Sequence, residues 1–162
     1  MQRKSLVVVL LLLYTAVVSW IGYLGADPGV AEAFTGSAGA VLIGALALVY
    51  GTVAGLTFWF VGFLTRLTYK MAAGRLAESR AAALDLVVVI ALFSRLPGLL
   101  TTHFLHSGVG VATLAVPLIV GAVLLARDKR VAGPRKLLVL LPLAGYLVID
   151  AVFLLTAVPA VS

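Results

Sequence analysis

Few residues of this chain have side chains that could do chemistry, and three charged ones lie inside apolar runs. Asp85 and Arg95 share one run, and Asp150 lies in another. An ionisable group near the centre of a membrane-spanning helix costs on the order of 2.5 to 3.5 kcal/mol on an insertion scale, so it tends to be paired or to mark a route for ions or protons. These three residues are therefore the candidate site, as paired charges or as stations of a polar path.

Arg95 and Asp150 are expected to form an ion pair. At about 1.5 Å per helical residue, each lies roughly 20 Å from the inner end of its helix, so their depths match. The pair can form within one chain or between chains. Pro97 removes a backbone donor and frees carbonyl oxygen for the guanidinium. In the alternative interpretation, both charges lie near the outer interface and extend to water.

Asp85 lies near the start of the same run as Arg95. It is expected to be a solvated anion at the end of a helix, within reach of Arg80 or a basic loop.

His103 and His106 are weak candidates for a metal site. They are three residues apart and can share a helical face, but a stable site needs three or four ligands, and no Asp or Glu lies close by in the sequence. A haem normally needs two histidines facing each other from different helices, and these are the only two in the chain. We therefore expect neither a metal nor another cofactor.

Enzymatic chemistry has no other signal in the sequence. Because the chain has no cysteine, disulfides, thiolate metal sites and thiol redox catalysis are excluded. Neither a nucleophile elbow nor a phosphate-binding glycine loop frames the remaining serine, histidine and acidic residues. We expect a protein that is not an enzyme.

The composition is that of a membrane protein. Of 162 residues, 63% are hydrophobic and 11% are charged, whereas charged residues make up roughly a quarter of soluble domains. The net charge of +6 comes from short basic blocks between apolar runs, a pattern that orients membrane segments. Anionic lipid headgroups at the inner leaflet are therefore the expected partners, and nucleic acid is not.

We predict an all-α, polytopic integral membrane protein with one membrane domain over residues 1–162 and five transmembrane helices. The amino terminus and the loops after the second and fourth helices hold eleven of the twelve Lys and Arg residues, and the twelfth is Arg95. The positive-inside rule then places the amino terminus inside and the carboxyl terminus outside. The predicted helices are 5–25, 38–66, 82–101, 109–126 and 137–158.

A cleaved signal peptide is the alternative for residues 5–25. Trp20 and Tyr23 favour a retained helix, because they are typical of an aromatic belt at the outer interface.

Small residues and prolines predict how the helices pack and bend. Gly44, Gly51 and Gly55 are separated by seven and four residues, and the last two form a GxxxG pair that lets helices approach closely. The partner is another helix of the bundle or a second copy. Pro97, Pro117 and Pro142 fall within predicted helices and are expected to break or bend them. The basic segment 66–80 is a cytoplasmic loop or a short helix on the leaflet, broken near Gly74.

Three segments resemble the Yip (Ypt-interacting protein) family of five-helix membrane proteins. A long second helix over 42–67 leads into the basic, glycine-containing loop 70–80. Residues 93–100, FSRLPGLL, are similar to the family's proline turn, and residues 133–142, GPRKLLVLLP, are similar to its basic entry into a proline-containing last helix. The inner loop lacks the family's double glycine and following aromatic residue. The resemblance implies a small, prokaryotic-type integral membrane protein without known catalytic residues.

The predicted function is that of a non-enzymatic membrane scaffold or accessory subunit, located in a prokaryotic plasma membrane. It would act through lateral helix packing and basic cytoplasmic loops, with other membrane proteins or further copies as partners. Two alternatives stay open. One is a small transporter or channel that uses Asp85, Arg95 and Asp150, and the other is a membrane subunit of a larger redox or export complex.

Overall fold

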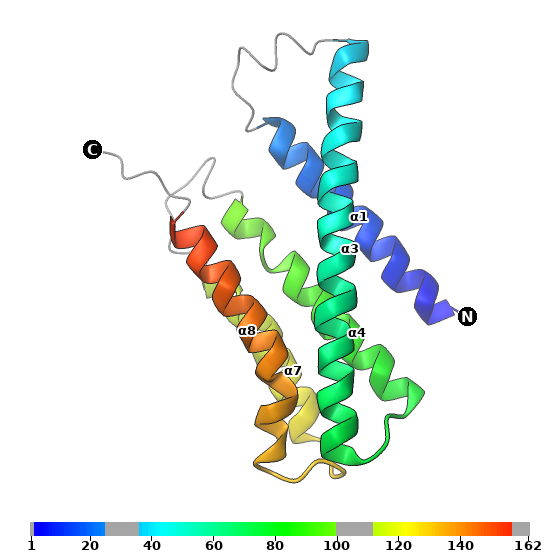
Figure 1. Cartoon of the computed structure of the whole chain (residues 1–162), viewed down its shortest axis with the longest axis vertical. Coiled ribbons are helices and arrows are strands. Elements are labelled where there is room, and N and C mark those ends of the chain that lie inside the picture. The colour runs from blue at the N-terminus through cyan, green and yellow to red at the C-terminus, as the bar shows by residue number, and fades with distance from the viewer. Residues whose placement is uncertain (1, 25–35, 100–111, 157–162) are drawn as a thin grey trace. The chain divides into compact units, whose positions relative to one another are not determined.

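The computed structural model describes residues 2–24, 36–99 and 112–156, which form helices joined by short turns (Figure 1). No strand occurs within these ranges, so the predicted all-α class is confirmed for them. The helices are α1 (Gln2–Leu24), α3 (Ser37–Ala73), α4 (Glu78–Phe93), α7 (Ala115–Ala126) and α8 (Arg135–Thr156).

Four helical segments are long and apolar enough to cross a membrane. They lie in α1, α3 and α8 and in the stretch Glu78–Leu99, which includes α4. These segments are compatible with a membrane location. At about 1.5 Å per residue, the 12 residues of α7 span roughly 18 Å, which is less than the hydrocarbon core of about 30 Å. Residues 100–111, before α7, lie outside the described ranges, so five crossings and their orientation stay predictions.

Helix α3 is longer than the sequence predicted. It continues through Ala73 rather than ending at residue 66, because a buried stripe persists among the basic residues. Thr65 and Tyr69, one helical turn apart, are both buried. The helix ends where Gly74 adopts a φ of 77°, the left-handed conformation that glycine tolerates best and that commonly terminates helices.

Two of the three predicted proline breaks coincide with helix interruptions. Helix α4 stops at Phe93, and helical structure resumes at 96–99; Pro97 has no N–H to donate to the carbonyl of Phe93. Helix α7 begins only after a turn at Leu114, because Pro117 cannot donate to the carbonyl of Thr113. Pro142 was also expected to break or bend its helix, but α8 runs through it without a break.

The chain divides into two compact units, Met1–Leu56 and Thr57–Ser162. In the first unit, α1 packs against the beginning of α3 at small residues. A Cβ atom built on Gly51 would lie 3.1 Å from the Thr15 Cγ2 atom, but one on Gly44 or Gly55 would meet nothing within 4 Å. Of the three predicted packing glycines, therefore, only Gly51 lies at a close helix contact.

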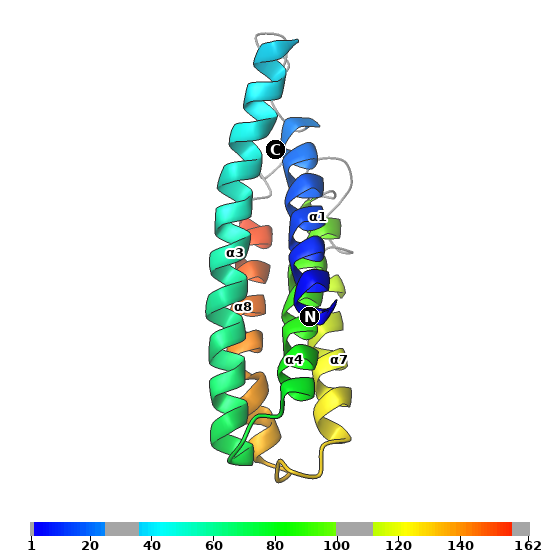
Figure 2. The same ribbon diagram turned by 90° about the vertical axis from the view of Figure 1, so that its right-hand side faces the viewer.

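In the second unit, α7 packs against both α4 and α8. Helices α4 and α8 run in one direction and α7 in the other (Figure 2). A Cβ on Gly98 would lie 2.7 Å from Leu154, and one on Gly121 would lie 2.8 Å from Leu140, so side chains of α8 pack closely against the backbone at these two glycines. The end of α3, the start of α4 and the loop between α7 and α8 gather at one end of the unit (Figure 2).

Candidate functional site

Asp150 and Arg95 join α8 to the turn that follows α4. The Nε atom of Arg95 lies 3.1 Å from Oδ1 of Asp150, and the Asp150 side chain is 6% exposed. The two atoms are close enough to form an ion pair, but the N–H group of Arg95 is not aligned for a hydrogen bond. One turn further along α8, the Phe153 ring lies 5.6 Å from the guanidinium carbon of Arg95, close enough for a cation–π interaction. The guanidinium is thus held by a carboxylate and an aromatic face of the same helix.

The interrupted end of α4 positions Arg95. Ser94 Oγ donates to the carbonyl of Ala91 at 2.9 Å, and Thr113 Oγ1 donates to the carbonyl of Ser94 at 2.9 Å. The second bond fastens the turn to the segment just before α7. On α8, Tyr146 lies one turn before Asp150. The turn that carries Arg95 is therefore held in place by hydrogen bonds from a serine and a threonine hydroxyl to backbone carbonyls.

Asp85 is not the solvated helix-end anion that the sequence predicted. Arg66 Nε donates to Asp85 Oδ1 at 2.7 Å, and the Asp85 side chain is only 14% exposed. The antiparallel course of α3 and α4 brings Arg66 beside Asp85. Gly62 leaves room here, because a Cβ on it would lie 4.0 Å from the carboxylate. Arg80, the partner suggested by sequence proximity, pairs with another carboxylate.

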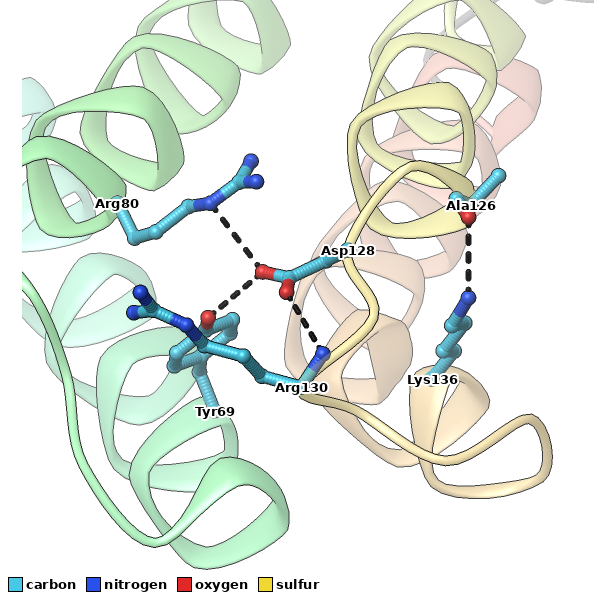
Figure 3. Close-up of polar contacts among 6 residues, drawn as sticks. All are labelled: Tyr69, Arg80, Ala126, Asp128, Arg130 and Lys136. Carbon is cyan, nitrogen blue, oxygen red and sulfur yellow. Dashed lines mark hydrogen bonds and ion pairs between the residues drawn. The ribbon is translucent and has the colours of Figure 1, made fainter.

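That carboxylate is Asp128, in the loop between α7 and α8 (Figure 3). Tyr69 donates its hydroxyl to Asp128 Oδ2 at 2.7 Å, and Arg80 Nε lies 3.2 Å from the same oxygen. The backbone N–H of Arg130 donates to Oδ1 at 3.0 Å. We call these four residues the Asp128 cluster. It joins the end of α3, the start of α4 and the loop after α7.

The Asp128 cluster keeps its carboxylate ionised although the side chain is only 3% exposed. Burial by itself opposes ionisation. The hydrogen bonds from Tyr69 and from the Arg130 backbone, together with the charges of Arg80 and Arg130, outweigh that effect and lower the pKa of Asp128 below its ordinary value. The contacts of this carboxylate are therefore charge-assisted at neutral pH.

Sequence reasoning missed Tyr69 and Asp128. A signal was present, since Asp128 is the one acidic residue in the basic block 127–136. A carboxylate that is surrounded by cations in the sequence can serve a local structural purpose, and this one holds its loop to the end of α3 and the start of α4. Tyr69 gave no comparable signal, because its partner lies 59 residues away.

The three predicted charges do not meet in one site. Asp85 belongs to the pair with Arg66, whereas Arg95 belongs to the pair with Asp150. His103 and His106 lie outside the described residues. Within the described ranges, no group of three or more His, Cys, Asp or Glu side chains is placed to hold a metal ion. What the described site residues form is a set of three polar ties between helices and loops.

The chain matches no protein-family model, and neither a curated protein nor a solved structure is significantly similar to it.

Proposed function

We propose that this chain is a non-enzymatic membrane scaffold or accessory subunit that acts through its outward helix faces and basic loops. The observation that carries the proposal is the pairing of charges in the second unit. Asp85, Asp128 and Asp150 are each engaged by an arginine from another segment. Because these charges are paired with one another inside the unit, the outer surface is left as the place where the protein acts.

The outer surface of α3 supports lateral contacts with other helices. Its exposed side chains are large and apolar, and the Trp59 and Phe63 rings stack with centroids 6.0 Å apart. Gly44 and Gly55 face open space, so a helix from another chain can approach the backbone there. Between Ser37 and Leu56, the exposed large apolar residues of α3 are Val41, Leu48, Val49, Val53 and Leu56.

We place the chain in a prokaryotic plasma membrane, as a Yip-like bundle of five helices with the amino terminus inside. The apolar outer faces support this placement, because exposed apolar surface of this extent needs lipid or a partner to cover it. The basic loops at one end of the second unit support an inner orientation of that end.

Disulfide crosslinking tests the scaffold proposal directly, because the chain has no native cysteine. We expect Leu48→Cys, at a side chain 72% exposed, to form crosslinked species in native membranes under mild oxidation. Ala54→Cys, at a side chain 3% exposed on the same helix, is the matched control and should not crosslink. A homodimer band supports a self-associating scaffold, and a heterodimer band supports an accessory subunit. If Leu48→Cys crosslinks no more than Ala54→Cys, the lateral contact on α3 is rejected.

Transport is the second candidate, and the buried Arg95–Asp150 pair is the observation that favours it. Ionisable residues inside transmembrane helices often mark ion or proton routes. Ion and proton flux into liposomes, compared between the original chain, Asp150→Asn and Arg95→Gln, tests this idea. A flux that depends on both residues supports transport, whereas a flux unchanged by both substitutions rejects it.

A further inference from the structure

The loop between α7 and α8 alternates buried and exposed side chains. Asp128 and Val131 are buried, whereas Arg127, Lys129 and Arg130 are exposed. We call residues 127–136 the basic loop. Asp128 and Val131 are turned inward and most of the cations are exposed, so the loop has a basic outer surface.

Contacts at both ends fix the backbone of the basic loop. Asp128 is held by Tyr69 and Arg80 (Figure 3). Val131 packs in an apolar cluster with Tyr69, Leu84, Leu125 and Val139. At the far end, Lys136 Nζ donates to the carbonyl of Ala126 at 3.1 Å, which satisfies a free carbonyl in the last turn of α7. The exposed cations are therefore carried on an anchored backbone and lose less entropy on binding a ligand than cations on a free loop would.

The anchoring contacts leave cationic donors unused. Arg130 meets Asp128 through its backbone N–H, and Arg80 meets it through Nε. The side chains of Arg127, Lys129 and Arg130 make no hydrogen bond or ion pair with other described residues, and the terminal nitrogens of Arg80 are also left over. Guanidinium groups bind phosphate oxygens in bidentate fashion, and an ammonium group adds a compact charge. The unused donors therefore suit a phosphate group.

The apolar surface of α8 sets the depth of the basic loop. Exposed apolar residues extend from Leu137 to Leu155, which at about 1.5 Å per residue is roughly 27 Å, close to a hydrocarbon core of about 30 Å. Arg135 and Lys136 immediately precede this surface. The basic loop therefore lies where the hydrocarbon of a bilayer ends and the lipid phosphates begin.

We propose that the basic loop binds an anionic phospholipid, with Lys129 and Arg130 at the headgroup phosphate and exposed leucines of α8 against the acyl chains. Arg135, Leu138 and Leu141 follow one another at a spacing of three, so a cation and apolar side chains share a face of the helix. A soluble anion would use only the cations, whereas a lipid uses both. This inference rests on the proposed membrane location and deepens the role of the basic loops.

Native mass spectrometry of the full chain in mild detergent tests the proposal. With equal amounts of phosphatidylglycerol and phosphatidylcholine, the original chain should retain phosphatidylglycerol preferentially. The double variant Lys129→Gln/Arg130→Gln removes two headgroup contacts and should lower that preference about thirtyfold. The matched control, Lys70→Gln/Arg75→Gln, removes two exposed cations near the other loop at the same end and should keep most of the preference.

Three results would overturn the proposal. The original chain could show no preference for phosphatidylglycerol, or the two double variants could lose the preference equally. Inorganic phosphate alone could also displace the lipid, which would indicate a site for a soluble anion. Lys129→Gln alone, at an exposed side chain that has no partner among the described residues, serves as a second variant and should show a smaller loss in the same direction. Melting temperatures in detergent identify any variant that does not fold. Crosslinking at Leu48 does not depend on the basic loop. Loss of the lipid preference with crosslinking intact would therefore reject only the lipid site, whereas loss of crosslinking would reject the scaffold proposal.

Discussion

The hydroxyl of Tyr69 donates a hydrogen bond to Asp128 at 2.7 Å, which links two residues 59 positions apart in the sequence. Tyr69 lies one turn before the end of α3, and Asp128 lies in the loop that follows α7. Because both side chains are buried, neither can exchange the bond for one to water. The bond therefore fixes the end of α3 to the loop between α7 and α8.

Tyr69→Phe keeps the buried ring and removes the hydrogen-bond donor. Leaving a buried carboxylate without this donor should lower the free energy of unfolding by about 1 to 3 kcal/mol. Denaturation in mixed detergent micelles measures this change. Tyr50→Phe is the matched control, because no hydrogen bond of the Tyr50 hydroxyl to a described residue is present, and it should cost no more than about 0.5 kcal/mol. Equal losses in the two variants would show that the Tyr69 bond contributes nothing of its own.

Asp128 should make stability depend on pH in the acid range. Its pKa is lower in the folded chain than the ordinary value of 3.8, so folding favours the ionised form. The stabilisation is complete above the ordinary value and is lost as the pH falls through the folded-state pKa. We expect the melting-temperature advantage of the original chain over Asp128→Asn to be constant above about pH 5 and to shrink below about pH 4. An advantage that does not change across this range contradicts the assignment.

Arg66 and Asp85 should be energetically coupled. A double-mutant cycle with Arg66→Gln and Asp85→Asn should give a coupling of about 0.5 to 1 kcal/mol, a modest value because the Arg66 side chain is 41% exposed. The same cycle with Arg80→Gln in place of Arg66→Gln should be additive, since Arg80 pairs with Asp128. Coupling of Asp85 to Arg80 instead would restore the partner that sequence proximity suggested.

Gly98→Ala should loosen the contact between the helical segment 96–99, which follows α4, and α8. The added Cβ would lie 2.7 Å from a methyl group of the buried Leu154, so Leu154 or the backbone must shift, at a cost of about 1 to 3 kcal/mol. Gly145→Ala is the control, because its Cβ meets nothing within 4 Å and alanine is the better helix former. Detergent melting temperatures should fall for the first variant and hold or rise for the second. Equal effects on both would argue against close packing at Gly98.

Local patterns predicted the main helices, and non-local contacts set their ends. The apolar runs of α1, α3 and α8 are long enough to identify them as helices without tertiary information. The end of α3 was misplaced because its cations resemble a loop. What keeps residues 67–73 helical is the burial of Tyr69 against the basic loop, which no short window of sequence contains.

In the candidate site too, one ion pair could be predicted from local sequence patterns and another could not. Arg95 and Asp150 could be matched by counting residues along two long apolar runs, since depth in a membrane is a property of position within a helix. Asp85 could not be assigned in this way. Its partner Arg66 comes from the preceding antiparallel helix, whereas Arg80 was nearer in sequence but projects to Asp128.

The Arg95–Asp150 pair should tie α8 to the turn after α4. A double-mutant cycle with Arg95→Ala, Asp150→Ala and the double variant, measured as the free energy of unfolding in detergent, tests this tie. Each single substitution leaves one buried charge unpaired, so the double variant should lose less stability than the sum of the singles, by about 0.5 to 3 kcal/mol. A double variant that loses the full sum would contradict the claim.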